Sequence, residues 1–209
     1  MRVISYNLRK HKASGELLAL ARNHDIDALC LQEVDSSDLP ETLGPLHLAD
    51  VTKGNRLGLA IYYRTTRFTA LDTQSFALKK SMHDRVLAPA HERLIGTRVM
   101  DNETQHELVI GSFHAAHAEL LSMGKGLMTL MVGDFNYPFF TKNLDMHMKN
   151  SGYALSLSNR RTYTRYKVFK GHFDFATSLG LDITSVETLP RGNSDHLPIL
   201  VTAEYGEGY

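Results

Sequence analysis

The chain has 209 residues, of which 43% are hydrophobic and 22% are charged. This composition excludes disorder and fibrous repeats, and the length indicates one domain, residues 1–209, with a sizeable core. The 23 basic and 23 acidic residues cancel. Overall charge therefore does not favour binding of long polyanions, and any phosphate chemistry must depend on local charge or on a metal ion.

Cysteine use and the N-terminal sequence bear on the compartment. Cys30 is the single cysteine and lies in the apolar run "ALCLQ", which is typical of a buried structural thiol in a reducing environment. The start "MRVISYNLRK" turns polar too soon for a signal peptide, and no run approaches the ~18 apolar residues of a membrane span. We expect a cytoplasmic monomer without membrane contact.

The first half of the chain predicts a strand, a helix and then further strands. Residues 2–8 and 27–34 are apolar enough for buried strands, and Ser14 is expected to cap a helix over residues 15–24. Residues 38–47 are rich in turn formers. The runs that follow are rich in β-branched and aromatic residues and predict consecutive strands over 57–64, 67–78, 93–100 and 106–114.

The second half mixes both element types. We expect a short helix over 116–124, a strand over 129–136 and a helix over 141–152 that ends at Gly152. Three more strands are expected over 172–178, 182–188 and 197–205. So many consecutive strands indicate largely antiparallel sheets with helices outside, an α/β sandwich rather than a doubly wound nucleotide-binding fold.

Polar residues recur where apolar strands end. They are Asn7, Glu33, His114, Asp134 with Asn136, and Asp195 with His196. Taken singly, each is as well explained as a turn former or a solvated rim residue. Strand ends at one sheet edge can converge, however, and the set contains what a site needs to hold a hard cation and move protons. Mg²⁺ prefers oxygen ligands, which Glu33, Asp195 and Asn7 could supply.

The segment "NRRTYTRYKVFKGH" concentrates basic and aromatic residues. Arg160, Arg161 and Arg165 flank Tyr163, an alternation typical of surfaces where cations meet phosphates and rings stack on bases. A solvated hairpin with inward-packed rings explains the pattern equally well. Local basic loops on a neutral protein fit a short nucleic-acid end or a small phosphorylated molecule better than long duplex DNA.

Six blocks carry a family resemblance: "SYNLR", "LQEVD", "GSFHAA", "VGDFN", "HFDFA" and "SDHLPI". In this order, from Asn7 to Pro198, they resemble the endonuclease/exonuclease/phosphatase superfamily, the fold of deoxyribonuclease I and the apurinic endonucleases. The resemblance implies a four-layer α/β sandwich, two packed mixed sheets flanked by helices. It also implies an active cleft at one sheet edge that cuts phosphate esters with Mg²⁺ or Mn²⁺.

Residue roles follow from the same resemblance. Asn7 and Glu33 match metal-binding positions, and Asp195 matches a further acidic position beside the metal. Asp134 and Asn136 match the pair that positions the attacking water and contacts the scissile phosphate. Each role is implied by the matching block and is an expectation for this chain.

The remaining roles concern proton transfer. His196 matches a histidine placed for proton transfer or transition-state stabilisation, Asp174 matches the acid that holds its ring, and His114 resembles the second histidine of deoxyribonuclease I. Either Asp134 or His196 could serve as general base, and His114 or a metal-bound water could protonate the leaving oxygen. A histidine beside a carboxylate tends to be protonated, which favours Asp134 as the base.

Three departures from the family pattern stand out. Residues 115–133 are fewer than the family usually has, so this wall of the cleft is trimmed or a loop is missing. Residues 55–64 contain no acid to pair with His114. His172 and Phe173 replace a common Arg and Ile, which weakens the case for a phosphate contact there.

We predict a divalent-metal-dependent phosphoesterase, a nuclease that acts on DNA or short nucleic-acid ends. The phosphate-ester substrate is thus expected to be a nucleic acid. The alternatives are a phosphatase or a lipid or small-molecule phosphodiesterase of the same fold, and a binding module without catalysis.

Overall fold

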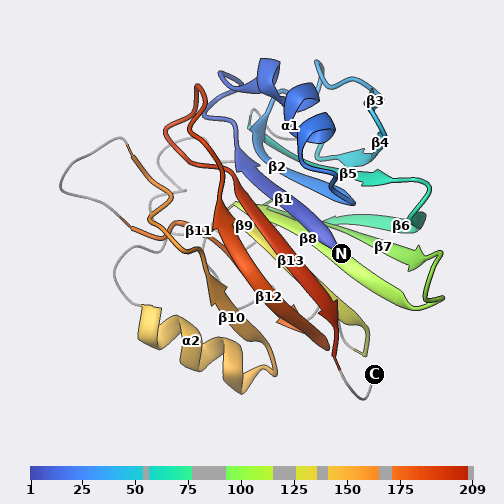
Figure 1. The fold of residues 1–209 in the computed structure, drawn as a ribbon, viewed down its shortest axis with the longest axis vertical. Helices are drawn as coiled ribbons and strands as arrows, with labels where there is room; N and C mark the ends of the chain where they lie inside the picture. The colour runs from blue at the N-terminus through green and yellow to red at the C-terminus, as the bar shows by residue number, and fades with distance from the viewer. Residues whose placement is uncertain (54–56, 77–92, 115–125, 136–140, 165–170, 207–209) are drawn as a thin grey trace.

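The structure is a computed structural model that describes residues 1–53, 57–76, 93–114, 126–135, 141–164 and 171–206. Strands dominate the described part and form two packed sheets (Figure 1). The predicted sandwich of two mixed sheets is confirmed, with less helical cover than expected. Within the described residues, no helix combines the length and apolar character needed to cross a membrane.

The first sheet, sheet A, has seven described strands in the order β12-β13-β1-β2-β5-β4-β3. Its strands are β1 (Arg2–Asn7), β2 (Ala28–Val34), β3 (Thr42–Leu43), β4 (Leu46–Val51), β5 (Gly58–Arg64), β12 (Leu181–Thr188) and β13 (Ile199–Tyr205). β1 and β2 pair in parallel, so both carry their C-terminal ends to the same edge. The other pairings in this sheet are antiparallel.

The second sheet, sheet B, has six described strands in the order β10-β11-β9-β8-β7-β6. Its strands are β6 (Phe68–Phe76), β7 (Leu94–Asp101), β8 (Glu107–His114), β9 (Met128–Asp134), β10 (Ala154–Leu157) and β11 (Asp174–Leu179). β8 and β9 form the parallel pair here. Both sheets therefore contain one parallel pair in an otherwise antiparallel set, as the long series of strands predicted.

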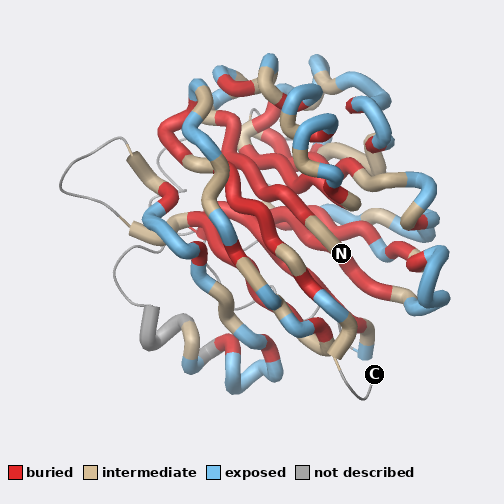
Figure 2. The backbone as a smooth tube through the Cα atoms, in the orientation of Figure 1, coloured by how far each residue is buried: buried red, intermediate tan, exposed pale blue. Residues whose placement is uncertain are grey.

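The main core lies between the two sheets, and the tube of Figure 2 is buried along most of the central strands that face it. Alternate residues of each strand face inward, because side chains switch sides at every position along a strand. The inward-facing apolar side chains include Val3, Cys30, Ile61, Ile110, Leu130, Val132, Ala176 and Val201. Cys30 is fully buried, as its apolar run predicted.

In the described part of the chain, two α-helices lie on the outer faces. α1 (Leu17–Asn23) packs Leu17 and Ala21 on the outside of sheet A, and α2 (Thr141–Asn150) packs Met148 on the outside of sheet B. The expected cap at Ser14 is wrong. Ser14 begins the 3₁₀ helix η1 (Ser14–Glu16), and neither η1 nor α1 starts with a side-chain cap hydrogen bond.

Most other predicted elements are present within one or two residues of the expected bounds. α2 is followed by Gly152 in a left-handed conformation, φ +83°, the helix stop that the sequence predicted. Two strand features were missed: the β3–β4 hairpin inside the turn-rich segment 38–47, and β10. The predicted helix over 116–124 lies within 115–125, outside the described residues.

Candidate active site

The inner faces of the strands change from apolar to polar at one end of the sandwich. In β9, Leu130 and Val132 point into the core, and the next position on the same face is Asp134. In β11, Asp174 occupies the corresponding position before Ala176. Because side chains alternate along a strand, these carboxylates continue the core face rather than pointing to the outer surface.

Two more strands end in the same way. β1 places Val3 in the core and ends at Asn7, and β8 places Ile110 in the core and ends at His114. His114 is paired with Asp134 across β8 and β9, and Asp134 with Asp174 across β9 and β11. We call this end of the sandwich the site end. The predicted convergence of distant strand tips is therefore confirmed for these four side chains.

Glu33 reaches the site end through a β-bulge. The pairing of β2 with β5 shifts between Gln32 and Val34, and Glu33 adopts a left-handed φ of +56°. Leu31 and Val34 both pack on the outer face of sheet A, three positions apart rather than two, because the bulge adds a residue. Without the bulge, Glu33 would occupy that outer apolar face. The strained conformation instead turns its carboxylate to the strand tips.

Four side chains meet around one amide. The Asn7 Nδ2 donates to Asp134 Oδ2 at 3.0 Å and to Glu33 Oε1 at 3.5 Å. The His114 Nε2 lies 3.6 Å from each of the same two oxygens. Two carboxylate oxygens are thus held beside the same two nitrogens, and their mutual repulsion favours a cation at this place. The sequence offers no acid in residues 55–64 to pair with His114. The acids that lie beside His114 are instead Glu33 and Asp134.

His196 bridges the two carboxylates of sheet B. Its Nδ1 lies 2.8 Å from Asp174 Oδ2, and its Nε2 lies 3.6 Å from Asp134 Oδ2. Like charges on directly paired strand positions repel each other, and an imidazolium between them relieves that repulsion. Burial by itself lowers the pKa of His196, yet the carboxylates of Asp174 and Asp134 outweigh burial and raise this pKa to about 10.

Close backbone packing sets the spacing of the β8 and β9 tips. Gly133 pairs with Phe113 one position before the His114–Asp134 pair. A Cβ added at Gly133 would lie 2.0 Å from the Phe113 carbonyl oxygen, much closer than any real contact. The glycine of "VGDFN" therefore lets the two strand ends approach, and with them the side chains of His114 and Asp134.

A short segment, residues 162–164, lies along the loop that carries Asp195 and His196. The Thr164 N–H and hydroxyl both donate to the Asp195 carbonyl oxygen, at 2.8 and 2.9 Å. Tyr163 forms an isolated β-bridge with His196, and the centroids of their rings are 5.0 Å apart. The Thr162 hydroxyl accepts from the backbone N–H of Asp174 at 3.1 Å. The segment thus fixes both members of the Asp174–His196 pair.

Asp195 is buried and points to the turn that follows β1. Its Oδ2 lies 3.4 Å from Arg9 Nε. Arg9, Lys10 and His11 all have positive φ values, and this left-handed turn brings the Lys10 N–H to Glu33 Oε2 at 2.8 Å. Asp195 and Glu33 therefore lie against the same turn, although 162 positions separate them in the sequence.

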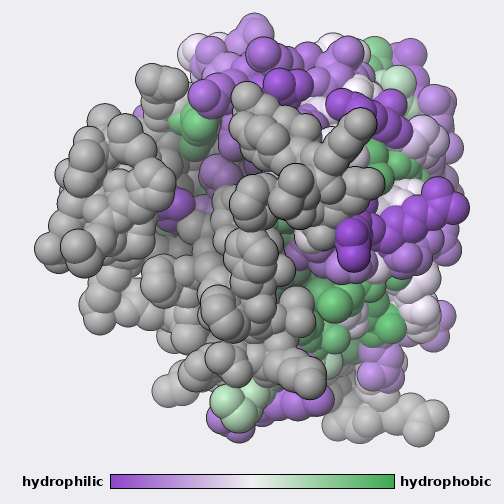
Figure 3. All heavy atoms as spheres, turned by 90° about the vertical axis from the view of Figure 1, so that its left-hand side faces the viewer, coloured by the Kyte–Doolittle hydropathy of each residue, from purple (hydrophilic) through white to green (hydrophobic). Residues whose placement is uncertain are grey.

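Of the other predicted residues, the structure describes Arg160, Arg161 and Tyr163. Arg160 and Arg161 are exposed, and Tyr163 contacts the Phe173 and His196 rings. Asn136 and Arg165 lie outside the described residues. The view from the side on which the strand tips lie shows a mainly hydrophilic described surface in its upper part (Figure 3).

Sequence reasoning missed three contributors. Arg9 contacts Asp195, and the fully buried Gln32 joins the sheets by donating to Ser112 Oγ at 3.0 Å. Thr162 supports Asp174. Arg9 and Gln32 lie inside the blocks "SYNLR" and "LQEVD". A charged or amide side chain in or next to an apolar strand is a signal that could have marked both as site residues. Thr162 gave no such signal.

The donor set suits a hard cation. Asp134, Asp174 and His196 offer ligand-type atoms within 4.8 Å of one another, so this buried cluster could hold a metal ion. The His196 Nδ1, however, is used in the 2.8 Å hydrogen bond to Asp174. The other Asp174 oxygen, Oδ1, is buried without a hydrogen-bond partner among the described residues. The oxygens of Glu33 and Asp134, which flank the Asn7 amide and the His114 imidazole, are of the type that Mg²⁺ and Mn²⁺ accept.

The sequence model of the Endonuclease/Exonuclease/phosphatase family matches residues 4–196. A search of curated protein sequences gives no match. Among solved structures, the mannosyl-6-phosphatase of Bacteroides thetaiotaomicron is similar with a TM-score of 0.75 and 20% identity, over 98% of this chain and 100% of that chain.

Two further structures are similar at lower identity. The human Nocturnin catalytic domain has a TM-score of 0.73 and 14% identity, over 98% of this chain and 94% of that chain. The D. rerio TDP2 complexed with single-strand DNA product has a TM-score of 0.72 and 13% identity, over 98% of each chain. At these identities the likeness concerns the fold.

Proposed function

Because the chain belongs to the Endonuclease/Exonuclease/phosphatase family, we propose that it is a divalent-metal-dependent phosphoesterase that hydrolyses phosphodiester bonds. One observation carries the proposal: strand tips far apart in the sequence bring Asn7, Glu33, His114, Asp134 and the Asp174–His196 pair to one end of the core. A purely structural role would not require three buried or half-buried acids to be grouped there.

We assign Glu33, Asn7 and Asp195 as the residues that would hold Mg²⁺ or Mn²⁺. The negative charges of Glu33 and Asp134 on the two sides of the Asn7 amide support a cation here, and the left-handed turn at Arg9 connects Asp195 to the same place. When bound, such an ion reduces the charge repulsion between a phosphate ester and its nucleophile.

We assign the proton-transfer roles to three side chains. His196, with its pKa raised to about 10, stays protonated near neutrality and can donate a hydrogen bond to a phosphate oxygen. Asp134 accepts from Asn7 and lies 3.6 Å from the nearest nitrogen of each histidine, so it is the group placed to take a proton from an attacking water. His114 can protonate the leaving oxygen.

For the substrate, we propose DNA or a short nucleic-acid end. Tyr163 supports this proposal, because its ring packs against His196 and forms an aromatic wall beside the reacting group. Arg160 and Arg161 precede it on the same segment and are exposed, as phosphate-binding cations must be. The likeness to TDP2 in complex with a single-strand DNA product agrees with this choice.

A sugar phosphatase is the second candidate. It is favoured by the likeness to a mannosyl-6-phosphatase, which covers the full length of that protein, and by a net charge of zero, which gives no long-range attraction for a polyanion.

A substrate panel with Mg²⁺ or Mn²⁺ tests both candidates: an oligonucleotide, a bis-aryl phosphodiester, an aryl phosphomonoester and a hexose phosphate. We expect metal-dependent turnover of the first two, lost in Asp134→Asn and kept in Asp182→Asn, which changes an exposed acid of β12. Turnover of the monoesters alone would assign the phosphatase. No metal-dependent turnover on any substrate would reject catalysis and favour a binding module.

A further inference from the structure

The loop before Asp195 is tied to the first strand of the chain. The Ser194 hydroxyl donates to the Asn7 carbonyl oxygen at 2.7 Å and accepts from the His196 N–H at 3.1 Å. The position of His196 along this edge therefore depends on how this loop is held against β1.

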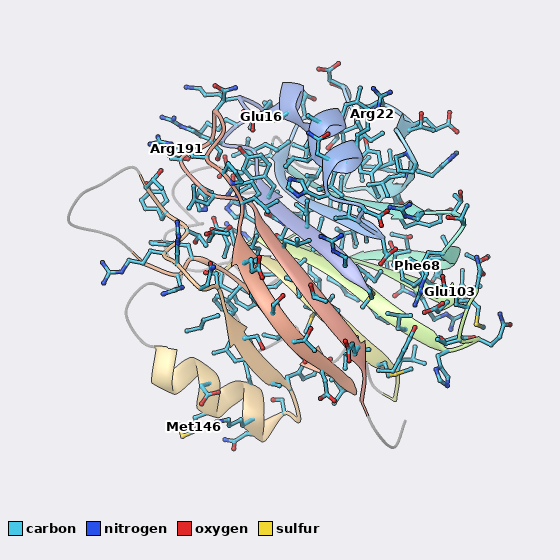
Figure 4. The ribbon with its side chains drawn as sticks, in the orientation of Figure 1. Glu16, Arg22, Phe68, Glu103, Met146 and Arg191 are labelled. Carbon is cyan, nitrogen blue, oxygen red and sulfur yellow. The ribbon has the colours of Figure 1, made fainter. Side chains whose placement is uncertain are left out.

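Glu16 holds the same loop from the outside. Its Oε1 accepts from the Asn193 N–H at 2.6 Å, and its Oε2 accepts from the Tyr6 hydroxyl at 2.9 Å. A Cβ added at Gly192 would lie 1.9 Å from Glu16 Oε2, so the carboxylate lies directly on the loop backbone. In Figure 4, Glu16 and Arg191 lie close together at the same end of the molecule.

These contacts matter because the Asp174–His196 hydrogen bond crosses the sandwich. Asp174 begins a strand of sheet B, whereas His196 lies in the loop that enters sheet A. Their 2.8 Å hydrogen bond is kept only if this loop stays in place relative to both sheets. A misplacement of about 1 Å in such a group can lower a rate on the order of 100-fold.

We propose that Glu16 is a positioning residue for His196, acting through Asn193, Tyr6 and Ser194 without touching the substrate. The proposal rests on the proposed function for its effect on rate, but its effect on the imidazole can be read without turnover. Two acceptor oxygens are needed, one for the Asn193 N–H and one for the Tyr6 hydroxyl. A glutamine at position 16 offers only one acceptor and places an amide group against the other donor.

The test compares Glu16→Gln with Glu187→Gln, which removes an exposed carboxylate from β12. In metal-free protein, the imidazole N–H proton of His196 that faces Asp174 is followed by NMR and assigned by its loss in His196→Asn. We expect this resonance to move or broaden in Glu16→Gln and to stay unchanged in Glu187→Gln. With Mg²⁺, kcat on the oligonucleotide should fall roughly 10- to 100-fold while KM changes little.

Tyr6→Phe provides a second route to the same loop, because it keeps the buried ring and removes the hydroxyl that donates to Glu16 Oε2 and orients its carboxylate. We expect the His196 resonance to move and kcat to fall, both by less than in Glu16→Gln. An unmoved His196 resonance in a folded Glu16→Gln or Tyr6→Phe variant would overturn the positioning role. If the wild type turns over no substrate, the proposed function fails, and the resonance still decides the role of Glu16.

Discussion

Buried aspartates occur at both ends of the sandwich, and their surroundings differ. At the far end, Asp101 is fully buried and binds the Arg67 guanidinium at 2.8 Å, the Tyr205 hydroxyl and the backbone N–H of Glu103 at 2.9 Å. These donors carry their protons permanently at neutral pH. Phe68 and Glu103, labelled in Figure 4, mark that end, away from Glu16.

At the site end, Asp134 and Asp174 are equally buried but share an imidazole. The groups beside them are His196, His114 and the Asn7 amide, and two of these three can gain or lose a proton. The same residue type at the end of the same core is thus bound by an arginine, a tyrosine and a backbone N–H in one place and lies beside imidazoles in the other. Because Asp101, Asp134 and Asp174 are all buried, the two ends differ in the groups that contact these aspartates.

Replacing Asp134 should have the largest effect. In Asp134→Asn we expect kcat to fall about 10²- to 10⁴-fold, because the proposed proton acceptor is lost. The melting temperature of the metal-free protein should stay equal or rise, since one of two facing carboxylates loses its charge. Steady-state kinetics and thermal unfolding check both parts. A variant with unchanged kcat would remove Asp134 from the mechanism.

The opposite result is expected at the far end. Asp101→Asn should lower the free energy of unfolding by about 1–3 kcal/mol, because the half-buried Arg67 loses the charge of the buried Asp101 carboxylate and keeps only its pair with the exposed Glu103. Urea unfolding measures the loss, with Asp182→Asn as the exposed control. Turnover at a temperature below unfolding should match wild type. A loss of activity without a loss of stability would contradict the division between the two ends.

The pH dependence of stability should identify the site end. The folded-state pKa of His196 is raised to about 10, above the ordinary ~6.5 of an unfolded chain. Its contribution is therefore complete below pH ~6.5 and is lost as the pH rises towards 10. In metal-free protein we expect the free energy of unfolding to fall across this window by a few kcal/mol at most, roughly 1.4 per unit of pKa shift.

His196→Asn should remove most of that alkaline decline in stability, measured by urea unfolding at several pH values. The arginine and backbone donors around Asp101 do not titrate in this range, so Asp101→Asn should keep the decline. If the free energy of unfolding of His196→Asn falls as steeply with pH as that of the wild type, this imidazole does not carry the positive charge between Asp134 and Asp174.

The smallest expected effect concerns backbone strain. Glu33 and Gln105 have nearly the same left-handed φ, +56° and +60°, and they lie at opposite ends. Glycine removes the steric cost of this conformation, so each substitution should stabilise the metal-free protein by ~1 kcal/mol. Glu33→Gly should abolish turnover and Gln105→Gly should not. Destabilisation of Glu33→Gly would show that its carboxylate contributes more to folding than its backbone conformation costs.

Much of the site could be predicted from the sequence because alternation is a local property. The spacing of Leu130, Val132 and Asp134 already places the acid on the core face. The bulge at Glu33 could not be predicted, because "ALCLQEV" reads as an uninterrupted strand and the φ of +56° depends on pairing with β5. Contacts of residues 162–164 with Asp195 are likewise set by tertiary packing alone.

The missed strands have a similar cause. Gly44 and Pro45 lie in a stretch that the sequence predicts as turn-rich, and they form the tight connection between β3 and β4, with Gly44 at φ +61°. β10 is only four residues long and half-exposed, so it has little apolar alternation. Both strands depend on a neighbouring strand for their hydrogen bonds, which a local pattern does not reveal.

The way strands end in this protein also limits how its sequence can change. Asp134 and His114 face inward because they lie an even number of positions beyond Val132 and Ile110 on the same face. Inserting or deleting a single residue within β8 or β9 would turn that tip outward, whereas two residues would restore its side. Length variation inside these strands should therefore occur in steps of two, and single-residue changes should be confined to the connecting loops.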